Sequence, residues 1–123
     1  MMQLDYASGE SIYIQIKENF KKLIISGSMK EDDAIPSVRA LASTLAINVN
    51  TVQRAYRELE AEGYIYSIPG KGNFVSRFSF EQRMKEKLNI EKKLEEIIKE
   101  AQYLNIEESE FNEMVKKIYE NKK

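Results

Sequence analysis

The sequence contains no cysteine and no histidine, and these two absences exclude several classes of function. Without cysteine there is no disulfide bond, and without either residue there is no thiolate or imidazole ligand for a metal ion. Nucleophilic catalysis through a Ser–His or Cys–His pair is excluded for the same reason. A hard-cation site built from carboxylates alone is compatible with the composition, but no motif indicates one. We therefore expect no cofactor, no metal site and no enzyme activity.

Long apolar runs are also missing from the 123 residues. They reach only a few residues, as in Leu23–Ile25, and nothing resembles a signal peptide or a membrane span. We therefore expect a cytoplasmic protein. The hydrophobic content of 42% is enough to bury a core, and the length allows one medium domain or one small domain with an appendage.

The stretch Ile35–Gly63 predicts two helices joined by a tight turn. A first helix over Ser37–Leu45 can begin at a capping serine, and Asn48 can cap a second helix over about Val49–Glu62. Gly63 is placed to end that helix, because glycine adopts the left-handed conformation without steric cost. The second helix has apolar side chains at the spacing of one buried face, namely Val52, Ala55, Tyr56 and Leu59.

The opposite face of the second helix is polar and basic. It carries Asn50, Gln53, Arg54 and Arg57, whose side chains are suited to base edges and phosphates because they offer several hydrogen-bonding groups in one plane. This pattern predicts the recognition helix of a helix-turn-helix. The alternative interpretation is a solvated helix face without a partner.

A small β-hairpin is expected directly after the two helices. Tyr64–Ile68 and Asn73–Val75 are rich in strand-forming residues, and the turn Pro69–Gly72 between them places Lys71 at the tip. A helix-turn-helix followed by such a hairpin predicts a mainly α-helical winged-helix fold, in which the hairpin lies beside a DNA duplex.

Four motifs in this order and spacing resemble the GntR family of bacterial transcription regulators. They are Pro36-Ser37-x-Arg39-x-Leu41-Ala42, Asn50-Thr51-Val52, Leu59-x-x-x-Gly63 and Gly70-x-Gly72-x-Phe74-Val75, and the resemblance covers about Ser11 to Val75. One departure is visible, because Lys30–Ala34 stands where the family usually has a glycine turn.

The resemblance implies which side chains contact DNA. The arginine of the Pro-Ser motif, the start of the recognition helix and the tip of the wing are the contact regions in the family. Together with Ser37 of the same motif and the two arginines of the helix face, the expected DNA-binding residues are Ser37, Arg39, Asn50, Thr51, Gln53, Arg54, Arg57, Gly70 and Lys71.

The formal net charge of −1 hides an uneven distribution. Residues 34–77 hold 5 Lys/Arg against 3 Asp/Glu, whereas residues 1–33 hold 4 against 6 and residues 78–123 hold 10 against 11. Only the segment expected to bind DNA is positive, and phosphate binding depends on the local charge. A single chain should therefore bind DNA weakly.

The N-terminal part completes the expected winged-helix domain over residues 1–77. Residues 1–10 are short and polar, and we expect an extended arm. Ser11 can then begin a helix that ends near Gly27 and carries one apolar face, formed by Ile12, Ile16, Phe20, Leu23 and Ile24.

Residues 78–123 predict two amphipathic helices with a break at Leu104–Ile106. The first has an apolar stripe at alternating steps of four and three, typical of a helix that pairs with another helix: Ile90, Leu94, Ile97, Ala101 and Leu104. Two such short helices cannot fully cover each other's apolar faces or enclose a metabolite cavity, so we predict that the stripe packs on a second subunit. Membrane attachment is a weaker interpretation, because the polar faces are mixed in sign.

The two-helix tail resembles that of the short YtrA-type branch of the family, whose members are dimeric repressors often linked to operons for ABC transporters. The resemblance implies a homodimeric repressor of its own or a transporter operon, bound to an inverted-repeat operator in double-stranded DNA. The sequence does not indicate whether a small-molecule effector tunes binding. The alternative is a winged helix used as a protein-interaction module, which would need an exposed apolar or acidic face in place of the polar and basic one.

Overall fold

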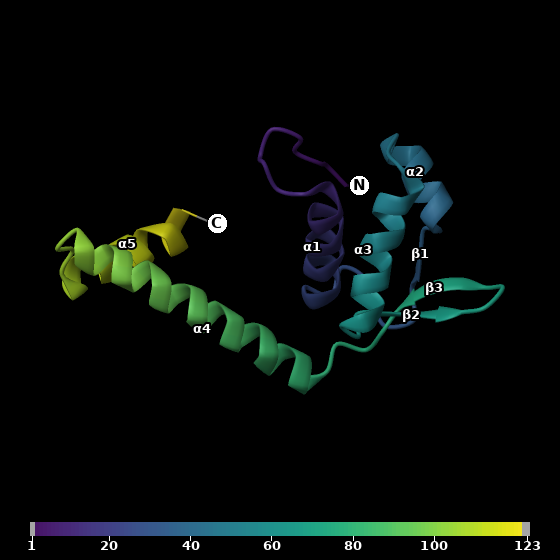
Figure 1. Cartoon of the computed structure of the whole chain (residues 1–123). Coiled ribbons are helices and arrows are strands. Elements are labelled where there is room, and N and C mark those ends of the chain that lie inside the picture. The colour runs from purple at the N-terminus through teal and green to yellow at the C-terminus, as the bar shows by residue number, and fades with distance from the viewer. Residues whose placement is uncertain (1, 122–123) are drawn as a thin grey trace. The chain divides into compact units, whose positions relative to one another are not determined.

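The computed structural model describes residues 2–121, which form two compact units. One unit ends at Ser79 and the other begins at Phe80. Figure 1 shows the elements along the chain. Within the described residues their order is α1 (Ile12–Ile25), β1 (Ala34–Ile35), α2 (Val38–Leu45), α3 (Val49–Ala61), β2 (Ile65–Ile68), β3 (Gly72–Val75), α4 (Phe80–Tyr103) and α5 (Glu108–Asn121).

The core of the first unit lies among α1, α2, α3 and the sheet, and α1 runs alongside α3 (Figure 1). The Phe20 ring meets the edge of Tyr56 at a centroid distance of 5.6 Å, which joins α1 to α3. Between the same two helices, Lys17 forms ion pairs with Glu58 and Glu62. The buried core residues are Ile16, Phe20, Ile24, Ile35, Leu41, Ala42, Val52, Ala55, Tyr56, Leu59, Tyr64, Ile65 and Val75.

The predicted ends of α2 and α3 are confirmed by their capping geometry. The Ser37 hydroxyl accepts a hydrogen bond from the Ala40 N–H at 3.0 Å, and the Asn48 side-chain oxygen accepts one from the Asn50 N–H at 2.7 Å. Gly63 follows α3 with a φ of 82°, the left-handed conformation expected after a helix.

The sheet has three antiparallel strands in the order β1-β3-β2, and the predicted hairpin supplies β2 and β3. β1 was not predicted from the sequence, and Ile35 was expected at the start of the helical stretch. Ala34 pairs with Phe74, and Ile35 pairs with Asn73. Two residues are too few to show the alternation that predicts a strand, so only the distant partner strand defines β1.

The N-terminal arm is held against α1 by one buried side chain, where an extended arm was expected. The Gln15 side-chain oxygen accepts from the Asp5 N–H at 2.7 Å, and its amide nitrogen donates to the carbonyl oxygens of Asp5 at 2.8 Å and Glu10 at 3.0 Å. Met2 and Leu4 pack against the core of the unit. The arm is therefore part of the folded unit.

Phe78 belongs to the first unit, although it was expected in the C-terminal segment. Its ring stacks on Tyr64 with centroids 6.2 Å apart and an interplanar angle of 19°. An isolated phenylalanine after a strand carries no local signal for such a contact, because its partner Tyr64 lies on the far side of the wing hairpin in sequence.

The second unit consists of α4 and α5, joined by a turn in which Asn105 has a φ of 58°. The predicted break at Leu104–Ile106 is confirmed. Ala101 is buried, whereas most other apolar side chains of the two helices are exposed. None of the described helices has the length and apolar character needed to span a membrane.

Candidate nucleic-acid interface

The outward face of α3 carries polar side chains that have no partner within the first unit. Asn50, Gln53 and Arg57 are exposed, opposite the buried face that packs on the core. In residues 2–121, none of these three side chains makes a hydrogen bond or an ion pair. Thr51 is half-buried at the start of the same helix. The face therefore presents free donors and acceptors in the form that base edges and phosphates require.

Two of the predicted DNA-binding residues, Ser37 and Arg39, lie at the start of α2 and differ in their hydrogen bonding. The Ser37 hydroxyl accepts the capping hydrogen bond from Ala40, so its oxygen is partly used by the helix, while its proton remains available. Arg39 is exposed, and within the described residues its guanidinium has no partner.

The wing ends in a tight turn that exposes a lysine. The Lys71 N–H donates to the carbonyl oxygen of Ile68 at 2.9 Å, which closes the turn. Gly70 has a φ of 77°, a conformation that favours glycine. Lys71 is exposed and has no ion-pair partner among residues 2–121. The turn thus leaves its ammonium group free to meet an anion.

A helix-turn-helix with a free polar face, followed by a wing with a basic tip, is the arrangement of winged-helix DNA-binding proteins. The sequence profile described as "Bacterial regulatory proteins, gntR family" matches residues 12–75, from α1 to the end of β3. The chain belongs to the GntR family.

Relatives of this GntR-family regulator agree with that assignment. The chain is 38% identical to the HTH-type transcriptional repressor YtrA of Bacillus subtilis (strain 168) over 119 residues, which cover 96% of this chain and 92% of that protein. Its fold resembles the crystal structure of a protein from Listeria monocytogenes EGD-e described as a transcriptional antiterminator. That match has a TM-score of 0.79 and 30% identity, and it covers 97% of this chain and 90% of the other.

A third comparison includes DNA. The AraR(DBD), solved in complex with the operator ORE1, matches with a TM-score of 0.53 and 28% identity over 62% of this chain and 93% of that domain. The winged-helix fold and the family predicted from the sequence are thus confirmed, and the chain is a transcription regulator with a DNA-binding fold, not an enzyme.

Arg54 of this GntR-family regulator differs from its neighbours on α3, because it is held by α1. Its guanidinium carbon lies 3.8 Å from the centroid of the Tyr13 ring, and its Nε lies 3.5 Å from a carboxylate oxygen of Glu58. Glu58 also accepts from Lys17 at 3.1 Å, a hydrogen bond that lowers the pKa of the Glu58 carboxyl. This contact could not be predicted from the sequence, because Tyr13 lies on another helix.

The pKa of Lys17 is raised by the same cluster. Burial alone would lower it, but the hydrogen bonds to Glu62 and Glu58 favour the charged form and outweigh the burial. Charged Lys17 therefore compensates the carboxylates of Glu58 and Glu62 at the contact between α1 and α3.

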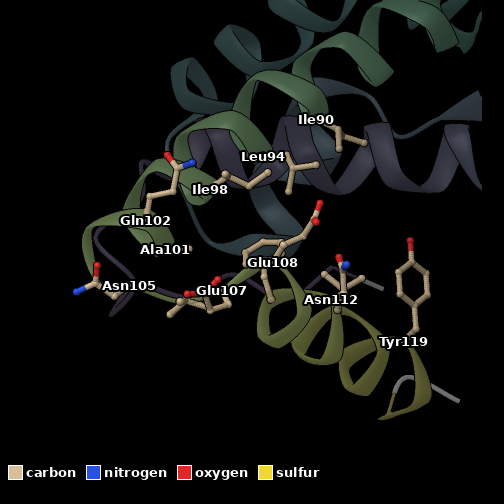
Figure 2. Close-up of a pocket in the computed structure, with 13 residues that line it drawn as sticks. Ile90, Leu94, Ile98, Ala101, Gln102, Asn105, Glu107, Glu108, Asn112 and Tyr119 are labelled. Carbon is tan, nitrogen blue, oxygen red and sulfur yellow. The ribbon is translucent and has the colours of Figure 1, made fainter.

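The second unit of this GntR-family regulator contains a groove of about 840 Å³ between α4 and α5. Figure 2 shows Ile90, Leu94 and Ile98 pointing from α4 toward the groove, with Tyr119 on the other side. The apolar lining comprises Ile90, Leu94, Ile98, Ala101, Ile106, Phe111, Val115 and Tyr119.

The predicted apolar stripe of α4 is therefore divided. Ile90, Leu94 and Ala101 line the groove together with Ile98, which was not predicted. Ile97 and Leu104 lie outside it, with 51% and 73% of their surface exposed. A straight α-helix has 3.6 residues per turn, so a stripe with a 3.5-residue repeat drifts around the axis and cannot stay on one neighbour.

Proposed function

We propose that this GntR-family regulator is a homodimeric repressor that occupies an inverted-repeat operator in duplex DNA. The free polar face of α3 is the single observation that carries the proposal. Asn50, Gln53 and Arg57 are exposed without partners in the described unit, while the opposite face of the same helix is buried. Several planar hydrogen-bonding groups on one helix face can form hydrogen bonds with base edges in the major groove of DNA.

The contact roles follow from the position and freedom of each side chain. We assign Asn50, Thr51 and Gln53 to base edges, because they lie in the first turns of the recognition helix, where base contacts concentrate. Arg57 lies further along α3 and is assigned to phosphate. Arg54 is also assigned to phosphate, because stacking on Tyr13 limits the directions that its guanidinium can take.

The remaining predicted contacts lie on α2 and the wing. Ser37 and Arg39 at the start of α2 reach phosphate, and Arg39 reaches a base edge where the groove allows it. Gly70 and Lys71 meet the DNA backbone or the minor groove from the wing tip. The AraR domain bound to operator ORE1 supports DNA contact by a related winged helix.

We attribute dimerisation to the C-terminal helices. Large apolar side chains that the second unit leaves exposed are Ile97 on α4, Leu104 in the turn after α4, and Met114 and Ile118 on α5. A second copy of the same unit can cover them, and a two-fold axis then relates the two recognition helices. The operator is accordingly an inverted repeat, and repression follows from its occupancy.

The regulated genes are inferred from the relatives. Similarity to the repressor YtrA over 96% of the chain supports repression, and resemblance to the YtrA-type branch points to the protein's own operon or a transporter operon. Binding to chromosomal DNA requires that the protein act in the cytoplasm.

Selection of duplexes from a random pool tests the proposal. The full chain is expected to enrich one sequence with two inverted half-sites, because each subunit reads the same bases. A parallel selection with the Asn50→Ala/Gln53→Ala double variant serves as the control and is expected to enrich nothing. Enrichment of a site without inverted symmetry, or the same site with both proteins, would overturn the assignment.

A further inference from the structure

The turn before β1 is locked to the wing by its backbone. The Asp32 N–H donates to the carbonyl oxygen of Val75 at 2.8 Å, and the Val75 N–H donates to the carbonyl oxygen of Asp33 at 2.9 Å. Asp32 has a φ of 70°, a left-handed conformation that is uncommon for a residue with a side chain. This turn lies in the run Lys30–Ala34, which stands where the GntR family usually has a glycine turn.

The Asp32 side chain continues the link across the sheet. The Tyr66 hydroxyl donates to a carboxylate oxygen of Asp32 at 2.6 Å. The Tyr66 ring stacks on Phe74, its partner on β3, with centroids 5.6 Å apart and an interplanar angle of 27°. The same hydrogen bond raises the pKa of the Tyr66 hydroxyl, because it favours the protonated form. Tyr66 therefore reaches from β2, over β3, to the turn before β1.

The hydrogen bond between Tyr66 and Asp32 lies at the base of the wing, where contacts with the rest of the unit set the direction of the hairpin. The strand order is β1-β3-β2, so β2 is an edge strand and pairs with β3 alone. At the tip, no other atom lies within 4 Å of the position that a Cβ would take at Gly70 or Gly72. The two glycines of the tip therefore face open space, and we expect contacts at the base of the wing to fix its position.

Asp32 does more than glycine could do at the same place. Glycine adopts a φ of 70° without strain, so the backbone turn alone does not call for an aspartate. The carboxylate supplies the acceptor for Tyr66, and a charged acceptor gives a shorter and stronger hydrogen bond than a neutral one. The strained conformation and the charged acceptor together indicate a side chain used to hold the wing.

We propose that Asp32 and Tyr66 are positioning residues that hold the wing so that Lys71 reaches the DNA. Neither residue contacts the duplex, and both act through the orientation of the hairpin. The inference rests on the proposed function, because it requires that the wing tip contact DNA.

Three substitutions separate the link from the fold. Tyr66→Phe keeps the ring stacked on Phe74 and removes only the hydroxyl. Asp32→Gly keeps the left-handed turn and removes the carboxylate, whereas Asp32→Asn keeps a neutral oxygen acceptor. In operator titrations with the full chain, Tyr66→Phe and Asp32→Gly are each expected to weaken binding about two- to tenfold, the effect of one hydrogen bond. Asp32→Asn should remain closest to the unmodified protein.

Combinations distinguish positioning from general destabilisation. The DNA affinity of the Tyr66→Phe/Asp32→Gly double variant should equal that of the single variant with the lower affinity, because each substitution removes the same hydrogen bond. In a Lys71→Ala background, Tyr66→Phe should have no further effect and should leave the salt dependence unchanged. Ser67→Ala is the matched control, because it removes a hydrogen bond of 2.7 Å to Asn73 that lies wholly within the hairpin. Ser67→Ala should bind DNA as the unmodified protein does.

The outcomes separate this inference from the proposed function. If Lys71→Ala weakens binding and Tyr66→Phe does not, the positioning role is wrong and the wing contact stands. Equal losses from Tyr66→Phe with and without Lys71, or equal losses from Ser67→Ala, also overturn the positioning role. If Lys71→Ala has no effect on binding, the wing contact fails and the positioning role fails with it, while base reading by Gln53 is still tested by its own variant.

Discussion

At the scale of single residues, the freedom of a side chain separates reading from anchoring. Gln53 is exposed on α3, and Lys71 is exposed at the tip of the wing. Gln53→Ala should weaken operator binding by about 1–3 kcal/mol and binding to random DNA very little, because it removes contacts to particular bases.

Lys71→Ala should weaken binding to all sequences alike and lower the slope of log affinity against log salt concentration by about one. Fluorescence anisotropy titrations with operator and random duplexes at several salt concentrations measure both effects. Equal losses from Gln53→Ala on both duplexes would contradict its role as a base reader.

The buried tyrosine of α3 gives the protein a defined sensitivity to alkaline pH. Tyr56 is 2% exposed, its hydroxyl donates to the carbonyl oxygen of Pro36 at 2.7 Å, and burial raises its pKa. The folded state thus favours the neutral phenol. The resulting stability is complete below the pKa of an unfolded tyrosine, near 10, and is lost as the pH rises above it, by up to about 1.4 kcal/mol per pH unit.

The variant Tyr56→Phe tests this dependence. At neutral pH it should lower the free energy of unfolding by about 1–3 kcal/mol, because the Pro36 carbonyl loses its donor. Above pH 10 its stability should fall less steeply than that of the unmodified protein. Urea unfolding followed by circular dichroism across pH 7 to 11.5 gives both curves, and the alkaline titration of Lys17 is common to them. Parallel curves above pH 10 would show that ionisation of Tyr56 does not limit the fold.

At the scale of elements, the features that depend on residues close together in the sequence were predicted correctly. Capping by Ser37 and Asn48 and the buried spacing of α3 belong to neighbouring residues, and the structure confirms the helices they predict. The strand β1 and the fixation of Arg54 by Tyr13 depend on partners far away in the sequence. Propensity and periodicity carry no information about such partners, which explains why both were missed.

The helix α4 shows a second limit of sequence patterns. A repeat of alternating four- and three-residue steps selected Ile97, whereas the groove with α5 uses Ile98. The pattern identified an apolar stripe on α4, but it does not tell which of its side chains pack against α5. The side chains on the uncovered edge, such as Ile97 at 51% exposure, are now the strongest candidates for contact with a second subunit.

A charge on this edge is expected to separate the subunits. Ile97→Glu would place a carboxylate in the interface of both copies and remove two apolar contacts, so the dimer dissociation constant should rise about a hundredfold or more. Leu88→Glu is the matched control, because Leu88 is 55% exposed and helix geometry places it about half a turn around α4 from Ile97. Sedimentation velocity over a range of concentrations measures both variants. A dimeric Ile97→Glu protein, or equal dissociation of both variants, would place the interface elsewhere.

At the scale of the whole molecule, positive charge is too sparse for one subunit to bind tightly. The segment from residue 34 to residue 77 has 5 basic side chains, and Arg54 already pairs with Glu58. Each phosphate contact contributes to affinity only through the counterions it releases, so one half-site should bind weakly at physiological salt. Joining two half-sites makes the second contact effectively intramolecular and can raise affinity by about a hundredfold or more when the geometry fits.

The spacing of the half-sites tests this coupling directly. A dimer fixes the separation and the relative rotation of its two recognition helices, so both can enter the major groove only on correctly spaced half-sites. Five inserted base pairs turn one half-site by about half a helical turn and place it on the opposite face of the DNA. Affinity should then fall to the level of a single half-site. A mobility-shift titration compares the intact operator, one half-site and the operator with five inserted base pairs. Equal affinity for the intact operator and the single half-site would mean that the subunits bind independently, which would contradict repression by a rigid dimer.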